Sequence, residues 1–368
     1  MARSKTRSKF LIIFLELLGL LLCFNFALYL MDVPRLDIFH DDTIKKQRFS
    51  SQDNVFRSEG YSRYHVNSYG LVGNEPVNLN RPGVIRTALF GDSLVEALQV
   101  SQHKKFASLL ENDSNAIDEN CGIETWNYGF QGDNLTNSYY RYVLQANSIP
   151  FDIVLFFVNE GDLFEITPLG SQDVGNRTIP SFDSRLENSM WFKFKYYFQR
   201  MTFALYYFRL RVKDYFMDTK NNFIELFADD KSQTINNVNK VEKILIPKLV
   251  KQIKTVDTKI KEQNKNVFFV GLPTARAMPE GLPTHEAFRQ TAYQTLANAL
   301  EQSGVNFINT YPGLADVTAN GVDPYSAWEP GGHLNEIGHD IVAKQISAIT
   351  GRSWQQTGGK EGCLNAIQ

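Results

Sequence analysis

The sequence predicts an α/β domain with three layers (α/β/α), in which helices cover both faces of a mostly parallel, five-stranded sheet. Five short apolar runs, rich in β-branched and aromatic residues, are typical of buried strands. Helical stretches separate these runs, and this alternation indicates a parallel sheet with crossover helices. Outside the sheet, the sequence predicts an apolar N-terminal helix and an aromatic-rich helical insert.

The predicted strands are short and end in small or polar residues. They cover residues 85–90, 124–128, 151–158, 266–270 and 305–308. We expect helices at 102–111, 134–146, 236–263, 285–303 and 338–349. Functional sites in such sheets form at the carboxyl ends of the strands, so polar residues there are the first candidates.

Composition excludes several classes of protein. The chain has 368 residues, of which 43% are hydrophobic and 21% charged, so it can bury a core and is not disordered. The formal net charge of −2 argues against a general nucleic-acid binder, which needs a basic excess. Three cysteines exclude a disulfide-rich scaffold and a four-cysteine zinc site. No cluster has metal-ligand spacing, so we expect neither a metal nor a cofactor.

The N-terminus predicts a membrane anchor. Residues 1–9 are basic, and residues 10–31 are almost wholly apolar, which is the length of a transmembrane helix. The basic flank predicts a cytoplasmic N-terminus, with the remaining chain periplasmic or extracellular at the cytoplasmic membrane. A cleaved signal peptide and a buried core helix are the alternatives. The residues after the apolar run fit a cleavage site poorly.

The rest of the chain divides by composition. Residues 32–80 are interpreted as a stalk and domain entry, 81–352 as the α/β domain, and 353–368 as a C-terminal tail. Within the domain, residues 182–230 form the expected helical insert. Its mixture of aromatic and basic residues is typical either of a cap on the core or of a membrane surface or groove. Outside the cytoplasm, Cys121 and Cys363 would be able to form a disulfide, or they remain buried thiols.

A candidate nucleophile follows the first predicted strand. The segment Gly91-Asp92-Ser93-Leu94 leads from this strand into a helix, where Ser93 projects into the crevice at the sheet edge. A serine hydroxyl needs a base within hydrogen-bond reach. His333 follows a Gly-rich loop and precedes a helix, so it can lean into the same crevice. The pair would support acyl transfer, with His333 as general base and acid.

Four blocks in this order resemble the SGNH, or GDSL, hydrolase superfamily. The first block is Phe90-Gly91-Asp92-Ser93-Leu94, and the second is Asn127-Tyr128-Gly129-Phe130-Gln131-Gly132. The third is Phe157-Val158-Asn159, and the last is His333-Leu334-Asn335 followed by Gly338-His339. Upstream, residues 66–70 are similar to a segment found in many membrane-anchored bacterial members. The resemblance covers about residues 60–350, except for the 182–230 insert.

The resemblance implies a set of roles. Ser93 would be the nucleophile, and its backbone N–H, the backbone N–H of Gly129 and the side-chain amide of Asn159 would hold the oxyanion. Such preorganised donors are each worth about 10²–10³ in rate. The family also implies an SGNH- or flavodoxin-like sheet.

Two positions depart from the family pattern. Asn159 is followed by Glu160-Gly161-Asp162, whereas the family has Asp directly after the Asn. The family's triad acid lies two or three residues before the His, where this chain has Gly331 and Pro330. We favour Glu329 as the acid; Asp323, or a backbone carbonyl in a Ser–His dyad, is the alternative.

Several of these residues also have a possible structural role. Ser93 is also a favoured helix N-cap residue, and His333 is also interpretable as a surface histidine. His339 is expected to be structural. Asn67 and Tyr69 either line the cleft or build a turn.

The sequence therefore predicts a membrane-anchored serine esterase or O-acyltransferase that acts through an acyl-Ser93 intermediate. The resemblance implies a small acyl group such as acetyl on an extracytoplasmic glycan or another ester as substrate, with no nucleic-acid partner. One alternative is a catalytically inactive glycan-binding or scaffold module of the cell envelope. Another is a lipase-like esterase, which the apolar insert favours.

Overall fold

The fold is that of a computed structural model. It describes residues 2–30, 38–39, 47–48, 52–56, 61–76, 84–115, 122–145, 149–163, 166, 241–274, 284–326 and 332–356. The insert at 182–230, Glu329, Cys121 and Cys363 lie outside these residues. The predictions made for them remain predictions.

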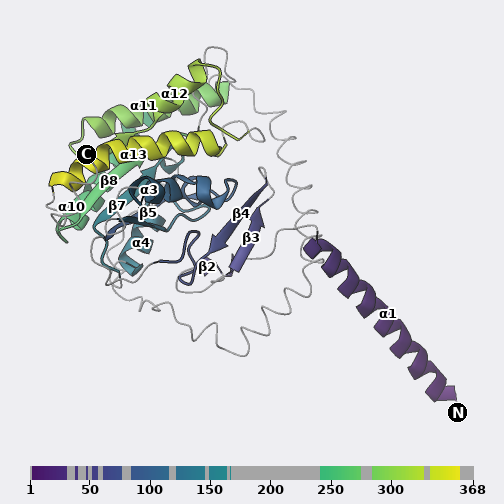
Figure 1. The fold of residues 1–368 in the computed structure, drawn as a ribbon. Helices are drawn as coiled ribbons and strands as arrows, with labels where there is room; N and C mark the ends of the chain where they lie inside the picture. The colour runs from purple at the N-terminus through teal and green to yellow at the C-terminus, as the bar shows by residue number, and fades with distance from the viewer. Residues whose placement is uncertain are drawn as a thin grey trace. The chain divides into compact units, whose positions relative to one another are not determined.

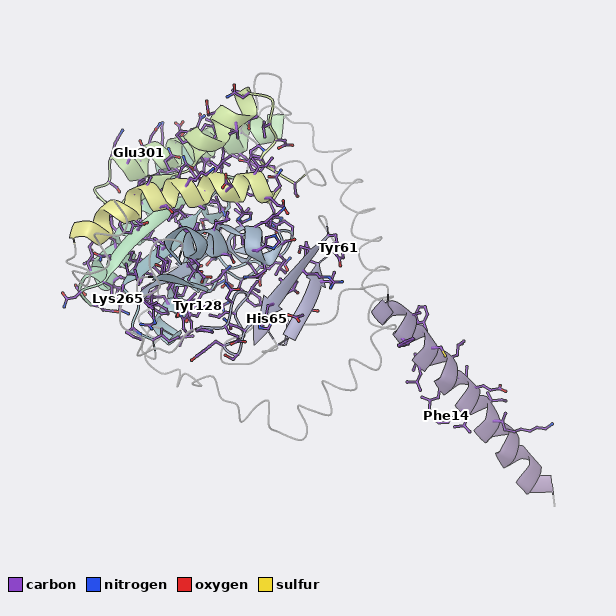
Figure 2. All side chains as sticks on the ribbon, in the orientation of Figure 1. Phe14, Tyr61, His65, Tyr128, Lys265 and Glu301 are labelled. Carbon is purple, nitrogen blue, oxygen red and sulfur yellow. The ribbon has the colours of Figure 1, made fainter. Side chains whose placement is uncertain are left out.

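The chain divides into two compact units, and the N-terminal helix α1 (Ala2–Leu30) belongs to the first. This helix joins the predicted basic tail and most of the predicted anchor into one element, and most of its described apolar side chains, including Phe14, are exposed (Figure 2). Among the helices that the structure describes, none combines the length and the apolar content that a membrane crossing requires. The anchor predicted at residues 10–31 stays a prediction from the sequence.

The second unit contains a five-stranded sheet in which every neighbouring pair of strands is parallel. Its spatial order is β6-β5-β7-β8-β9. The strands are β5 (Val84–Phe90), β6 (Gly122–Asn127), β7 (Ile153–Val158), β8 (Asn266–Gly271) and β9 (Phe307–Asn309). The order reverses at β5, whose two neighbours are the next two strands along the chain. Such a reversal opens a crevice at the carboxyl ends of the strands.

Helices cover both faces of the sheet (Figure 1), as predicted. One face packs against α4 (Leu135–Gln145), α10 (Ile246–Lys261) and α11 (Thr284–Glu301). The other packs against α2 (Ser93–Glu96), α3 (Phe106–Asn115), α12 (Tyr311–Ala319) and α13 (Glu336–Gln356). Because β7 is covered on both sides, all six of its residues are buried and apolar, which explains its continuous apolar run.

Boundaries differ from the prediction where proline or a tight turn intervenes. The predicted helix at 236–263 is seen from Val241, and its first five residues, Val241–Leu245, form a π-helical turn (η3). The α-helix α10 starts with a proline in its first turn, where the missing N–H costs nothing. The start of the predicted helix at 102–111 is a 3-10 turn, η1 (Gln102–Lys104). Helix α12 was not predicted, although Pro312 again marks its first turn.

The described part of the segment interpreted as stalk and domain entry contains two small two-stranded sheets. Strands β1 (Ile38–Phe39) and β2 (Gln47–Arg48) form one two-stranded sheet. Strands β3 (Gln52–Phe56) and β4 (Ser62–Val66) form the other, as an antiparallel pair. The apolar side chains of Tyr64 and Val66 on β4 pack against Leu98, next to helix α2. This part of the chain is therefore packed against the domain.

Candidate active site

Ser93 stands at the first position of α2, in the tight turn that follows strand β5. The N-cap is Asp92, whose Oδ1 accepts a hydrogen bond from Leu94 N at 2.9 Å. Capping therefore does not occupy the Ser93 hydroxyl, and the interpretation of Ser93 as the N-cap is wrong. Gly91 makes the turn possible, because an added Cβ would lie 2.4 Å from Val95 Cγ2. The tight strand-to-helix turn presents the hydroxyl at the carboxyl edge of the sheet.

His333 reaches Ser93 from the other end of the domain. Its Nε2 lies 2.7 Å from Ser93 Oγ, across 240 residues of sequence. With the proton on Nδ1, Nε2 accepts the serine hydroxyl proton, which is the contact that general-base catalysis requires. Both side chains are only partly buried, so a substrate would be able to approach them.

The loop that carries His333 is fixed on both sides. Gln99 follows α2 and donates from Nε2 to the carbonyl of Leu334 at 2.9 Å, which ties this loop to the nucleophile's helix. The Asn335 side chain accepts from Ile337 N and Gly338 N at the start of α13. The position of the imidazole therefore follows from the docking of α13.

Gly129, the second predicted oxyanion donor, packs directly on α2. A Cβ added there would lie 2.5 Å from Glu96 N and 2.7 Å from Val95 Cβ, so only glycine allows this approach. Its N–H donates to Asn127 Oδ1 at 2.9 Å, and Asn127 Nδ2 donates to Val95 O at 2.8 Å. An oxyanion would have to share the Gly129 N–H with Asn127. The position of Gly129 fits its predicted role, but the role itself stays a prediction.

Asn159 directly follows β7 and lies beside the nucleophile's turn. Its amide Nδ2 donates to Asp92 Oδ2 at 2.9 Å, and its Oδ1 accepts from Gly161 N at 2.7 Å. The amide thus lies next to the residue before Ser93. Sequence reasoning brought Ser93, Gly129, Asn159 and His333 to one edge of the sheet, and the structure places each of them at or beside the α2 N-terminus.

The carboxylate of Asp92 also shapes this site. Burial raises the pKa of Asp92 above its usual value, while the hydrogen bonds from Leu94 N and the Asn159 amide and the charge of His333 oppose this rise. The carboxylate accepts one hydrogen bond on each oxygen, from the α2 backbone and from Asn159. Asp92 is a structural acceptor here, which links the nucleophile's turn to the predicted oxyanion donor.

The residue that orients His333 is not assigned. Glu329, the favoured acid, lies outside the described residues. Asp323, the alternative, accepts a hydrogen bond from Tyr325 N on its Oδ1 at 3.0 Å. Its backbone carbonyl accepts another from Asn335 Nδ2. The choice between a triad and a dyad therefore stays open.

Asn67 builds a turn. Its Oδ1 accepts from Tyr69 N and Leu71 N, both at 3.0 Å, and its Nδ2 donates to Asn74 O, also at 3.0 Å. The ring of Tyr69 packs edge-on against Trp126, with ring centroids 4.7 Å apart. Because Trp126 lies on β6, three residues before Gly129, the turn supports the strand that carries the second block.

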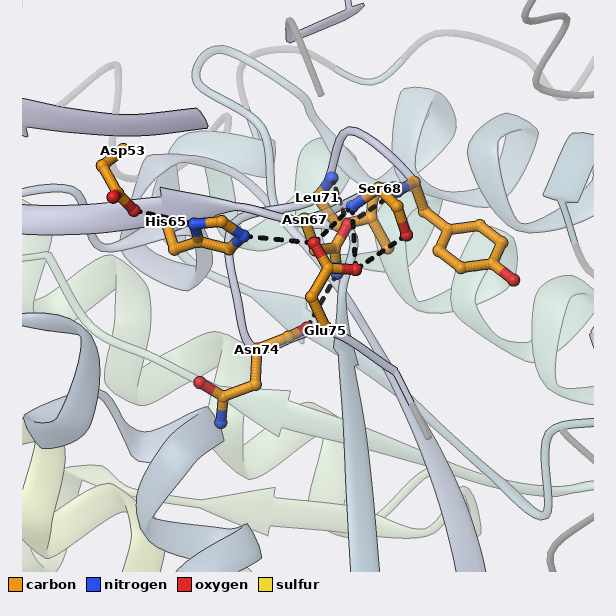
Figure 3. A network of polar contacts seen from close by, with 8 residues as sticks. Asp53, His65, Asn67, Ser68, Leu71, Asn74 and Glu75 are labelled. Carbon is orange, nitrogen blue, oxygen red and sulfur yellow. Dashed lines mark hydrogen bonds and ion pairs between the residues drawn. The ribbon is translucent and has the colours of Figure 1, made fainter. Parts of the chain in front are cut away.

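A polar network continues from this turn to the β3–β4 hairpin (Figure 3). Glu75 accepts from Ser68 N at 2.9 Å and from His65 Nε2 at 3.2 Å, while His65 Nδ1 contacts Asp53 Oδ1 at 2.8 Å. Burial alone would lower the pKa of His65, but the hydrogen bonds and charges of Asp53 and Glu75 outweigh it and raise the pKa above 6.5.

His339 lies in the core, as expected for a structural residue. It is fully buried on α13, stacks on Phe106 and accepts from Phe106 N through Nδ1 at 3.2 Å. Burial, together with the positive charges of Lys105 and His333, lowers the pKa of His339 to about 3. A neutral ring at this position helps dock α13 on α3, and thereby helps hold His333 in place.

Sequence reasoning missed the supporting residues of this site. Asp162, which was noted only as part of a departure from the family pattern, accepts from Asn159 N and Leu135 N. The Asn-x-x-Asp spacing from Asn159 is a helix-capping signal that would have found it. Gln99 carries no local signal, because its partner Leu334 is 235 residues away. In the part of the chain that the structure describes, no group of three or more His, Cys, Asp or Glu side chains has metal-binding geometry.

Among known proteins, the chain is similar to solved structures. No protein-family model matches the chain, and no curated protein matches it. A solved α/β hydrolase, LAE5 from the metagenome of Lake Arreo in Spain, is 12% identical, with a TM-score of 0.43 over 78% of this chain and 99% of that one. The acetyl xylan esterase AlAXEase is 14% identical, with a TM-score of 0.39 over 72% of this chain and 100% of that one.

A catalytic mutant of the acetylxylan esterase Axe2 from Geobacillus stearothermophilus is also similar. It is 12% identical, with a TM-score of 0.41 over 73% of this chain and 95% of that one. At these TM-scores the similarity adds nothing to what the residues of this chain themselves indicate about fold and activity.

Proposed function

We propose that this chain is a serine esterase of the SGNH type, which removes or transfers a small acyl group through an acyl-Ser93 intermediate. One observation carries the proposal: His333 Nε2 lies 2.7 Å from Ser93 Oγ, at the carboxyl edge of the parallel sheet. A serine hydroxyl in contact with an imidazole at such an edge is the arrangement of an activated nucleophile. An acetyl ester of an extracytoplasmic glycan is the substrate that the sequence resemblance implies.

The geometry supports the following course of reaction. Ser93 Oγ attacks the ester carbonyl carbon while its proton passes to His333 Nε2, and the carbonyl oxygen becomes an oxyanion. The N–H of Ser93 is one of the groups that a helix start leaves without an intrahelical partner, so it is oriented to donate to this oxygen. The Asn159 amide supplies a second donor, and Gly129 a third if its N–H is shared.

Breakdown of the tetrahedral species completes the first half-reaction. The bond to the alcohol oxygen breaks, and the imidazolium of His333 returns its proton to that oxygen. In the second half, water or a sugar hydroxyl gives its proton to His333 and attacks the carbonyl carbon of acyl-Ser93. The bond from this carbon to Ser93 Oγ then breaks, and His333 returns the proton to Oγ as the acylated product leaves. Water makes the protein an esterase, and a sugar hydroxyl makes it an acyltransferase. Location outside the cytoplasm stays a prediction from the sequence.

A fluorophosphonate probe tests the nucleophile. The full chain would be treated with the probe, and the adduct located by peptide mass spectrometry. We expect an adduct on Ser93 that is absent in Ser93→Ala and much slower to form in His333→Gln. Ser101→Ala is the matched control, because Ser101 is partly buried at the start of a 3-10 turn on the same connection and should leave labelling intact.

Absence of labelling in folded wild-type chain would contradict the proposal and favour the glycan-binding or scaffold module. If Ser93 is labelled, acetate release from a chromogenic acetyl ester, measured with and without an added oligosaccharide acceptor, separates the esterase from the acyltransferase. Activity that rises steeply with acyl chain length would instead favour a lipase-like enzyme.

A further inference from the structure

The turn after β7 forms a reciprocal capping arrangement around Asn159. This turn, η2 (Glu160–Leu163), is a short 3-10 helix. Asn159 Oδ1 accepts from Gly161 N at 2.7 Å, and Asp162 Oδ2 accepts from Asn159 N at 3.0 Å. In a capping box, the side chain three residues after the N-cap accepts from the N-cap N–H, as Asp162 does from Asn159. The Asn159 side chain accepts in return from Gly161, two residues on, which is the other position that an N-cap side chain reaches.

The capping arrangement allows only one direction of the Asn159 amide. Its oxygen faces an N–H donor, that of Gly161, and its nitrogen faces an acceptor, the Asp92 carboxylate at 2.9 Å. A flipped amide would place oxygen against the Asp92 carboxylate and NH₂ against the Gly161 N–H, so both contacts would become repulsive. The amide nitrogen is therefore held on the side of the nucleophile's turn.

Asp162 also connects this turn to the element that follows Gly129. Its Oδ1 accepts from Leu135 N at 2.8 Å, and Leu135 is the first residue of α4. The Asp162 side chain is 7% exposed, so these two hydrogen bonds are formed away from bulk water. One carboxylate thus accepts from the backbone of Asn159 and from the helix that begins six residues after Gly129, and it joins the two loops that carry the predicted oxyanion donors.

We propose that Asp162 is a positioning residue for catalysis, which acts by fixing the direction of the Asn159 amide and the spacing of the two oxyanion loops. This inference rests on the proposed function, because it assigns Asn159 a task in ester chemistry. It also accounts for the departure of this chain from the family pattern, since the carboxylate of Asp162, three residues after Asn159, accepts a hydrogen bond from Asn159 N.

Asp162→Asn removes one acceptor while conserving shape. The aspartate accepts from two N–H groups, whereas an asparagine has one oxygen and must turn its NH₂ toward one of these donors. We expect kcat for a chromogenic acetyl ester to fall about 10- to 100-fold, because small misplacements at a reacting centre cost about that much. KM should stay within about threefold, since no substrate contact is removed.

Asp152→Asn is the matched control for that variant. Asp152 directly precedes β7, and its Oδ2 accepts from Arg86 N at 2.8 Å, so it makes the same type of contact at the opposite end of the same strand. The control should keep kcat, and because Asp152 is exposed whereas Asp162 is buried, it should lose less stability. If both variants lose kcat equally, Asp162 has only a structural role and the inference is wrong.

Gly161→Ala tests the amide direction without changing any charge. A Cβ at Gly161 would lie 2.8 Å from Asn159 Oδ1, and the amide, as the end of a side chain, can rotate away while the fold is kept. We expect kcat to fall about 10-fold or more with little change in melting temperature. Because this variant does not touch Asp162, it remains informative if Asp162→Asn fails to fold.

A double-mutant cycle with Asn159→Ala decides between the two explanations. If Asp162 acts through Asn159, Asp162→Asn should lower kcat less in an Asn159→Ala background than in the wild type, and the fall that remains measures its effect on the loop that carries Gly129. The inference would be overturned if the effects of Asn159→Ala and Asp162→Asn on kcat were fully additive, or if Gly161→Ala kept the wild-type kcat. In either case, Ser93-dependent turnover by the wild type would still uphold the proposed function. If the wild type shows no such turnover, the proposed function fails and the inference fails with it.

Discussion

Replacing Gly129 with alanine should damage catalysis far more than it damages the fold. The added Cβ would lie 2.5 Å from the backbone nitrogen of Glu96 and 2.7 Å from Val95 Cβ. To restore a normal separation of about 3.5 Å, the Gly129 loop and the first turn of α2 must move apart by about 1 Å. The obstructing atom is in the backbone of α2, so no side-chain rotation relieves the contact. The displacement therefore falls between the nucleophile's helix and a predicted oxyanion donor.

The magnitude follows from that displacement. A misplacement of about 1 Å at a reacting centre costs about 10²-fold in rate, and forcing an extra carbon into a packed site costs about 1–3 kcal/mol of stability. We expect kcat for a chromogenic acetyl ester to fall about 100-fold, in a chain that stays folded at 25 °C. The measurements are steady-state kinetics and thermal unfolding of the full chain, with the Ser93 labelling rate as a second readout.

Gly73→Ala is the control for this prediction. Among the described residues, a Cβ there would meet Gln102 Nε2 alone, at 4.0 Å, so alanine should fit and leave both activity and stability unchanged. A Gly129→Ala chain that keeps kcat within about threefold would refute the reasoning. It would mean either that α2 and the loop can separate without consequence or that the loop has no part in the reaction.

Three further predictions concern the histidines. His333→Gln should lower kcat about 10²–10⁴-fold with an unchanged melting temperature, because it removes the general base; activity retained in that variant would exclude His333 from this role. Burial lowers the pKa of His339 to about 3, so the neutral ring contributes fully to the free energy of unfolding above pH 6.5. This contribution is lost as the pH falls below 6.5, by about 1.4 kcal/mol per pH unit. Urea unfolding of wild type and His339→Gln between about pH 6.5 and 5 should show this slope in the wild type alone, and equal slopes would contradict it. His65 has a raised pKa, so its contribution to the free energy of unfolding is complete below pH 6.5 and is lost as the pH rises through the folded-state pKa. Glu75→Gln should lower the midpoint of the His65 ring titration measured by NMR, and an unchanged midpoint would show that Glu75 does not stabilise the imidazolium.

The layered fold was predictable because it depends on local patterns. Strand β7 is covered on both faces, and a strand in that position must be apolar at every residue, as residues 153–158 are. Helix α12 escaped prediction because its nine residues carry a weak apolar pattern, with Leu314 as its buried residue. The N-terminal anchor was inferred from composition alone and stays a prediction; helix α1 begins at Ala2 and therefore includes the basic residues 3–9 as well.

The site was predictable in its reacting groups but not in its support. Ser93, Asn159 and Gly129 each follow a strand, and parallel strands end at one edge, so sequence order was enough to bring them together. The contacts of Asp92 with Asn159 and of Gln99 with Leu334 link positions 67 and 235 residues apart. No periodicity records such partners, because they depend on how loops pack after the sheet has formed.

The great separation of Ser93 and His333 along the chain has a consequence for folding. Strands β5, β6 and β7 follow one another closely along the chain, whereas the imidazole reaches Ser93 only when α13 docks on α3, which closes a very long loop. Reactivity of the serine therefore reports the docking of α13 rather than the formation of secondary structure. During refolding, covalent capture of Ser93 should lag behind the recovery of circular dichroism, and a chain shortened before α13 should recover its strands while its hydroxyl stays inert.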